Sequence, residues 1–134
     1  MDLKALLKKG RGQLFDFMPE PRAEALAETL IAFANADGGT ILLGLGTGGT
    51  LLEATDSEHA EAVLLRAEGM CRPAVQTSWQ PLATEQGTAI SIAVPRSPLL
   101  HSLSDGRVLL RSGARNRPLR GEEIRHLALS LIHI

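Results

Sequence analysis

The stretch LIAFANADGGTILLGLG, residues 30–46, decides the fold of this chain. Apolar residues recur at helical spacing in its first half, which predicts the end of a helix with one buried side. Asn35 and Asp37 tolerate left-handed backbone angles, and Gly38-Gly39 lacks Cβ atoms, so we expect the chain to reverse within a few residues. Thr40 to Leu45 is a continuous apolar run, which is typical of a strand buried on both faces.

Working outward, the remaining segments alternate between helical and extended patterns. Helices are expected over residues 3–9, 22–35 and 58–69, and through Leu127 and Leu131 near the end of the chain. Short strands are expected over residues 13–17, 75–82, 88–94 and 107–111, and residues 112–118 are expected to form a loop. We therefore predict an α/β fold over residues 1–134, a single domain with a mixed, mainly antiparallel sheet and packed helices. The apolar end, residues 130–134, suits a chain that continues in its natural context or a terminus that is not native.

Composition narrows the class of protein. The chain has 134 residues with 44% hydrophobic and 22% charged residues, which is enough for one domain with an aliphatic core. A single cysteine, Cys71, excludes an internal disulfide and suggests a reducing compartment, so we expect a cytoplasmic protein. No apolar run has membrane-spanning length, and no membrane partner is expected. The net charge of −1 gives no overall attraction for nucleic acid.

Several catalytic and cofactor patterns are absent. Residues 44–49 formally read G-x-G-x-x-G, but no helix opens directly after them, as a dinucleotide site requires. No lysine follows these glycines, so phosphoryl transfer has no support. The four histidines and Cys71 lack metal-ligand spacing, and no nucleophile motif is present. We therefore expect no catalytic residue, no metal and no cofactor.

A run of arginines between residues 107 and 120 is the strongest functional signal that the residues give directly. Arginine holds phosphate bidentately, and several such contacts on one loop give salt-sensitive binding without sequence preference. An equally open alternative is that these arginines pair with the acidic residues between Glu20 and Glu61. The predicted phosphate contacts are Arg107, Arg111, Arg115, Arg117 and Arg120, with Arg96, Lys8, Lys9 and Arg11 as outer contributors.

The order of five segments resembles the Schlafen AlbA-like domain, a family earlier labelled divergent AAA. The segments are Ala32–Leu45, Val94–Ser97, Asp105–Arg107, Leu110–Arg115 and Glu122–Ile124. The resemblance covers the chain from about Met1 to Leu127. It implies an α/β domain that binds nucleic acid, commonly at the N-terminus of bacterial transcriptional regulators.

Some relatives are RNA-cleaving enzymes that hold a divalent metal with three carboxylates, and this sequence departs from them. The usual glutamate–phenylalanine–lysine reads Asp16-Phe17-Met18, the upstream glutamate position falls on Arg11, and the third acid falls near Gly46-Thr47. One carboxylate cannot hold a metal firmly or divide the roles of a metal-dependent nuclease. Asp16 is therefore expected to be a solvated acid beside a turn.

These observations predict a nucleic-acid-binding module without enzyme activity, in a bacterial-type transcriptional regulator. DNA is favoured over RNA, and a homodimer that pools two basic surfaces is an expected partner. Two alternatives stay open: a metal-dependent Schlafen-type endoribonuclease, and a protein–protein or dimerisation module in which the arginines meet carboxylates.

Overall fold

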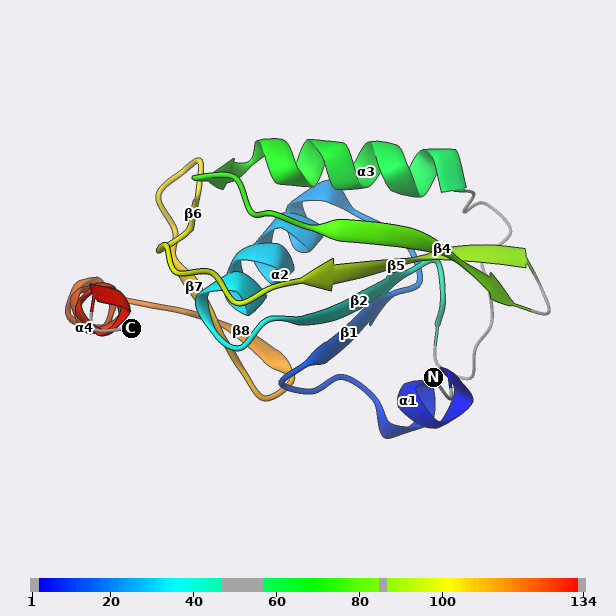
Figure 1. The fold of residues 1–134 in the computed structure, drawn as a ribbon, viewed down its shortest axis with the longest axis horizontal. Helices are drawn as coiled ribbons and strands as arrows, with labels where there is room; N and C mark the ends of the chain where they lie inside the picture. The colour runs from blue at the N-terminus through cyan, green and yellow to red at the C-terminus, as the bar shows by residue number, and fades with distance from the viewer. Residues whose placement is uncertain (1–2, 47–56, 85–86, 133–134) are drawn as a thin grey trace.

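The computed structural model describes residues 3–46, 57–84 and 87–132 (Figure 1). A four-stranded sheet lies at its centre, in the order β1 (Phe15–Met18), β2 (Gly39–Leu43), β5 (Gly87–Val94) and β4 (Ser78–Thr84). Strands β1 and β2 run parallel, and the other two pairings are antiparallel. The predicted α/β class with a mixed, mainly antiparallel sheet is confirmed. The part of the G-x-G-x-x-G segment beyond Gly46 lies outside the described residues.

Helices cover both faces of the sheet. Ile41 and Leu43 of β2 are buried against α2 (Ala23–Asn35) and α3 (Ser57–Gly69). Leu42, which points to the opposite face, belongs to a second cluster with Leu7 of α1 (Leu3–Lys9). Because successive residues of a strand face opposite sides, burial of all three requires cover on each face. The prediction of a strand buried on both faces is confirmed.

The turn between α2 and β2 depends on glycine, as predicted, but the residue with the left-handed angle is Gly38 alone. Gly38 has φ +76°, and the described residues include no non-glycine residue with positive φ. A Cβ on Gly38 would stand 2.6 Å from the carbonyl oxygen of Val94. Asn35 and Asp37 tolerate left-handed angles but do not adopt them here. The turn instead needs a residue without a side chain, because β5 passes directly beside it.

The side chain of Asn35 links the end of α2 to distant parts of the chain by hydrogen bonds. Its side-chain Nδ2 donates to the carbonyl oxygens of His101 (2.9 Å) and Leu109 (3.0 Å), and its Oδ1 accepts from the backbone N–H of His101 (2.9 Å). The ring of His101 is buried and lies 2.8 Å from the carbonyl oxygen of Pro73 and 2.7 Å from Ser97 Oγ. One buried amide thus holds three backbone groups that the sheet does not satisfy.

The remaining strands form two small ribbons. Strand β3 (Cys71–Arg72) pairs with β6 (Ser102–Leu103), and β7 (Leu109–Ser112) pairs with β8 (Arg115–Pro118). Residues 115–118 were expected in a loop, so this prediction is corrected: the loop contracts to a tight turn with Gly113 at φ +61°. Pairing with β7 makes this polar segment a strand, which its sequence alone does not reveal.

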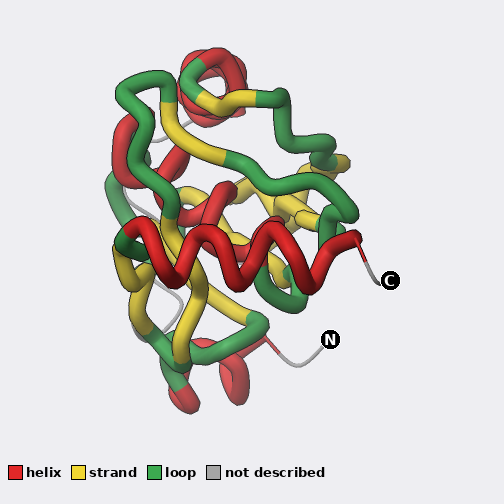
Figure 2. Tube along the Cα trace, turned by 90° about the vertical axis from the view of Figure 1, so that its left-hand side faces the viewer, coloured by secondary structure: helices red, strands yellow, loops and turns green. Residues whose placement is uncertain are grey.

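Helix α4 (Gly121–Ile132) lies at one end of the molecule, and α1 lies toward the other end (Figure 1). Turning the molecule by 90° shows α4 lying across that end (Figure 2). None of its described side chains joins either hydrophobic cluster. The predicted helix through Leu127 and Leu131 is confirmed. None of the helices in the described ranges combines the length and the hydropathy that crossing a membrane requires.

Candidate nucleic-acid interface and the Asp16 network

Arg111 is the predicted phosphate contact that the structure places in the interior. Only 1% of its side chain is exposed, and the guanidinium carbon lies 4.7 Å from the ring centre of Phe33. Its nitrogens donate hydrogen bonds at 2.8–3.1 Å to oxygens of Gly12, Phe15, Asp16 and Asn116. Arg111 therefore has no group to offer an external phosphate, and the prediction of a surface contact at this residue is wrong. The reason is register: Arg111 lies opposite Asn116 on the inward face of the β7–β8 ribbon.

Arg11 is half-exposed and also committed to internal partners. Its Nε donates to Asp16 Oδ1 at 2.9 Å, and its Nη2 donates to the carbonyl oxygen of Phe17 at 3.1 Å. The guanidinium carbon lies 4.2 Å from the ring centre of Phe17. The expectation that Asp16 is a solvated acid is also wrong, because this residue is only 7% exposed. Its carboxylate instead lies between two guanidinium groups.

Two further arginines form ion pairs on the surface. Arg107 bonds Asp105 at 2.9 Å and lies 3.7 Å from Glu28, and Arg117 bonds Glu123 at 2.6 Å. The backbone N–H and then the guanidinium of Arg107 lower the pKa of Asp105, and the hydrogen bond from Arg117 lowers the pKa of Glu123. Such exposed pairs are weak and compete little with a polyanion. Among the described residues, the alternative of pairing with the acids between Glu20 and Glu61 therefore holds for Arg107 alone, through Glu28.

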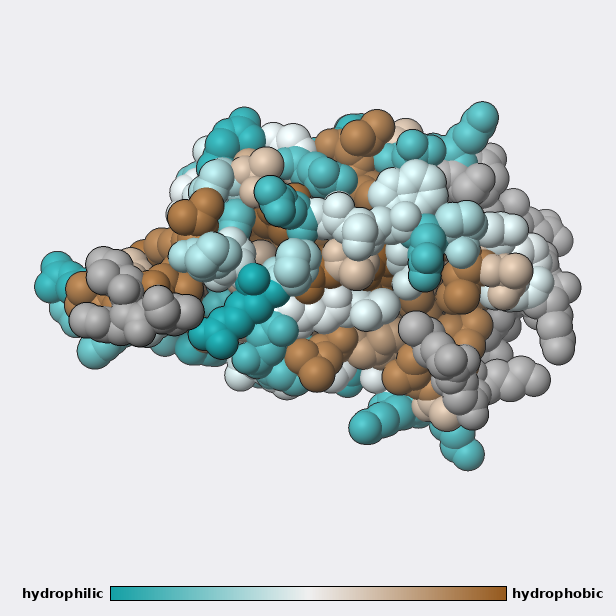
Figure 3. All heavy atoms as spheres, viewed as in Figure 1, coloured by the Kyte–Doolittle hydropathy of each residue, from teal (hydrophilic) through white to brown (hydrophobic). Residues whose placement is uncertain are grey.

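Five of the predicted cations are exposed and have no hydrogen bond or ion pair from their side chains to the residues that the structure describes: Lys8, Lys9, Arg96, Arg115 and Arg120. They do not form one continuous patch. Lys8 and Lys9 end α1, whereas Arg120 precedes α4 at the other end of the molecule (Figure 1). Strongly hydrophilic side chains are likewise scattered over the face seen in Figure 3.

The backbone of Arg96 lies at the turn between α2 and β2, and the ribbon that carries Arg115 is tied to the same turn. The backbone of Arg96 passes beside Gly38, where an added Cβ would stand 2.9 Å from its amide nitrogen. Gln13 connects the other side of this turn to the β7–β8 ribbon. Its Nε2 donates to Asp37 Oδ2 at 3.1 Å, and its Oε1 accepts the backbone N–H of Gly113 at 2.7 Å. Arg96 thus lies in the chain beside the turn, and Arg115, 19 positions later in the sequence, lies in the ribbon that Gln13 ties to the turn.

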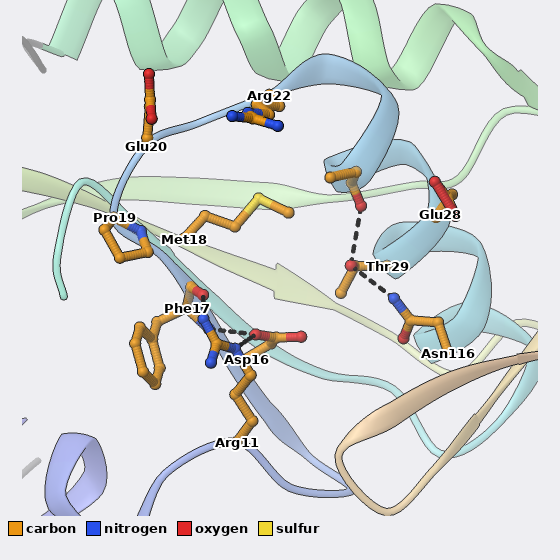
Figure 4. Close-up of a pocket in the computed structure, with 11 residues that line it drawn as sticks. Arg11, Asp16, Phe17, Met18, Pro19, Glu20, Arg22, Glu28, Thr29 and Asn116 are labelled. Atoms are coloured by element: carbon orange, nitrogen blue, oxygen red, sulfur yellow. Dashed lines mark hydrogen bonds and ion pairs between the residues drawn. The ribbon is translucent and has the colours of Figure 1, made fainter. Parts of the chain in front are cut away.

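A groove of about 540 Å³ opens beside Asp16, between β1 and α2 (Figure 4). Two arginines and three carboxylates line it, together with Thr29 and Asn116, and Asn116 Nδ2 donates to Thr29 Oγ1 at 3.0 Å. The charged lining residues are Arg11, Asp16, Glu20, Arg22 and Glu28. An excess of carboxylates does not suit a polyanion, so the groove is not the phosphate surface.

Sequence reasoning missed Gln13, Asn35 and Asn116 as organising residues. Each has an amide that bonds at least one group far away in the sequence, so no local spacing reveals these partners. Asn35 belongs to the motif that carries the family resemblance, but the sequence does not reveal the hydrogen bonds that its side chain makes.

The fold and this arrangement of arginines define a small α/β domain with separate exposed cations and a buried arginine–carboxylate network. The model of the family described as Schlafen, AlbA_2 matches residues 2–120, and the chain belongs to this family. The resemblance stated from the sequence is confirmed.

Comparison with solved structures shows the same fold in a much longer protein. The crystal structure of the DIP2311 protein from Corynebacterium diphtheriae matches with a TM-score of 0.62 and 18% sequence identity, over 86% of this chain. The chain spans 23% of the length of that protein, and at this identity the likeness is one of fold alone. No curated protein matches the chain.

The three-carboxylate metal centre of some Schlafen relatives does not fit the residues at Asp16. Asp16 Oδ1 accepts from Arg11 Nε and from the backbone N–H of Phe17 at 2.7 Å, and Oδ2 accepts from Arg111. A cation would have to displace donors that already neutralise the carboxylate. Within the described ranges, no group of three His, Cys, Asp or Glu side chains is placed to hold a metal ion.

Proposed function

We propose that this Schlafen AlbA_2 domain binds nucleic acid by its phosphates, with DNA favoured over RNA, as a non-catalytic module of a bacterial-type transcriptional regulator. The observation that carries the proposal is the pair of exposed arginines, Arg96 and Arg115, whose side chains have no internal partners among the described residues. Family membership supports a nucleic-acid-related role. Arg120, Lys8 and Lys9 are outer contacts in this proposal.

Binding of this kind has a definite chemical character. Guanidinium groups reach phosphate oxygens with two parallel N–H donors, which favours Arg96 and Arg115 over a lysine at the same places. The proposed contacts reach phosphates and not base edges, so we expect little dependence on sequence. With few contacts and a net charge of −1, a single domain binds modestly, and we propose that a homodimer pools two such surfaces.

The state of Asp16 supports a role without catalysis. A metal-dependent nuclease needs carboxylate oxygens that are open to a cation and to the attacking water. Here both oxygens of Asp16 accept hydrogen bonds from arginines. No observation at Asp16 therefore favours the nuclease alternative.

Fluorescence anisotropy with labelled duplex DNA of random sequence tests the proposal. The protein, the double variant Arg96→Ala/Arg115→Ala and the control Arg66→Ala are titrated between about 50 and about 200 mM salt. Arg66 is an exposed arginine on α3, so its loss removes one positive charge outside the proposed set of phosphate contacts.

We expect the double variant to bind roughly tenfold more weakly or worse, because two charge-assisted contacts are lost. The slope of log affinity against log salt should fall by about 2, and Arg66→Ala should leave both nearly unchanged. Absence of binding at the lowest salt, or equal behaviour of the double variant and the control, refutes the proposal. A parallel titration with single-stranded RNA tests the preference for DNA, and light scattering during gel filtration tests the homodimer.

A further inference from the structure

Strand β1 forms an open edge of the central sheet, and its outward backbone groups need partners. The sheet order places β2 on one side of β1 only. The carbonyl oxygens of Leu14 and Met18 accept from β2 and the residue after it, so those of Phe15 and Phe17 face away from the sheet. Exposed strand edges invite pairing with other chains, and native proteins protect them.

The Asp16 network supplies partners at this edge, in addition to the backbone N–H of Gly12, which donates to the carbonyl oxygen of Phe15 at 2.9 Å. Arg111 donates to the carbonyl oxygen of Phe15 at 3.1 Å, and Arg11 donates to that of Phe17 at 3.1 Å. Asp16 accepts the outward N–H of Phe17 at 2.7 Å and holds both guanidinium groups. One carboxylate and two arginines, together with the Gly12 N–H, therefore close the edge of the sheet with hydrogen bonds.

We propose that the Arg11 guanidinium stands where a divalent cation would otherwise lie between Asp16 Oδ1 and the Phe17 carbonyl oxygen, so that Asp16 locks the edge of β1 without a metal. The inference does not depend on nucleic-acid binding. The poor fit of this site to a metal has its cause in a single residue that prevents metal binding. Arg11 is that residue, since Arg111 approaches the other carboxylate oxygen.

The geometry shows how one substitution would change the site. Arginine Nε and glutamate Oε each follow three side-chain carbon atoms, so Arg11→Glu places a carboxylate oxygen close to the present position of Nε. That position is 2.9 Å from Asp16 Oδ1. Two oxygens bound to one small divalent cation at about 2.1 Å lie roughly 3 Å apart, and the Phe17 carbonyl oxygen faces the same place. Arg11→Glu would therefore remove the fixed guanidinium group and leave a site that an exchangeable metal ion can occupy.

Manganese binding tests the proposal with Arg11→Glu and its neutral control Arg11→Gln. We expect the free Mn²⁺ signal in electron paramagnetic resonance to fall with Arg11→Glu only, with Kd of about 1 mM. At a concentration about tenfold above Kd, Mn²⁺ should raise the Tm of this variant by about 5 °C. An equal response of Arg11→Gln or of the unaltered protein overturns the proposal, as does an Arg11→Glu variant that ignores Mn²⁺.

Asp16→Asn tests the lock separately, by thermal unfolding in EDTA and in Mn²⁺. Loss of a buried charge between two arginines should lower Tm by roughly 10 °C in both conditions. A site built for a metal predicts the opposite, because removing one carboxylate leaves the metal-free protein as stable or more stable. Should Asp16→Asn fail to fold in both conditions, the lock is supported, and an unchanged Tm in EDTA overturns it.

Discussion

Replacement of Asn35 by alanine should be one of the most damaging polar substitutions in this domain. The side chain is 5% exposed and makes three hydrogen bonds of 2.9–3.0 Å to backbone groups of His101 and Leu109. Alanine keeps the helical backbone of α2 at this position and removes all three bonds. The loss therefore separates the end of α2 from the segment that leads into β7.

The expected decrease in the free energy of unfolding follows from the three hydrogen bonds. Each buried bond contributes about 1 kcal/mol net, and the groups left behind have no solvent access, so the free energy of unfolding should fall by about 3 kcal/mol. An unfolding entropy of about 2.1 cal/mol/K per residue gives about 0.28 kcal/mol/K for 134 residues. The expected decrease in Tm is therefore about 11 °C.

Urea unfolding followed by circular dichroism measures this change. Gln76→Ala is a matched control, because Gln76 carries the same amide on an exposed position with no hydrogen bond to the described residues. The control should stay within about 0.5 kcal/mol of the unaltered protein. A loss below about 1 kcal/mol for Asn35→Ala would show that water or a small rearrangement satisfies the backbone groups, and the reasoning would be refuted.

Two further predictions concern Gly38 and Cys71. Gly38→Ala should lower the free energy of unfolding by about 3 kcal/mol or more, because φ is +76° and the new methyl group would stand 2.6 Å from the Val94 carbonyl oxygen. Gly113→Ala, at φ +61° with open space around it, should cost only about 1 kcal/mol in the same urea titration, and equal losses would contradict the steric argument. Burial raises the pKa of the Cys71 thiol to about 11, so the thiolate exists only well above neutral pH. Alkylation by iodoacetamide at pH 8, followed by mass spectrometry, should be at least roughly a hundredfold slower than in urea, and comparable rates would contradict the burial of this thiol.

The sequence alone determined the central helix, turn and strand. The predicted helix over residues 22–35 is α2, from Ala23 to Asn35, and the predicted strand from Thr40 to Leu45 overlaps β2. These elements follow from local rules, since helical spacing, two glycines and an apolar run each act within a few residues. The family resemblance was also visible from the order of short motifs along the chain.

Only the tertiary structure decided which arginines are available. Arg111 and Arg115 are the same residue type, four positions apart, yet the pairing of β7 with β8 turns the first inward opposite Asn116 and leaves the second on the outer face opposite Ser112. Asp16, which holds Arg111, lies 95 positions earlier in the chain. Sequence spacing cannot reveal a contact of this kind, because strand register and the meeting of distant segments are set by packing of the whole domain.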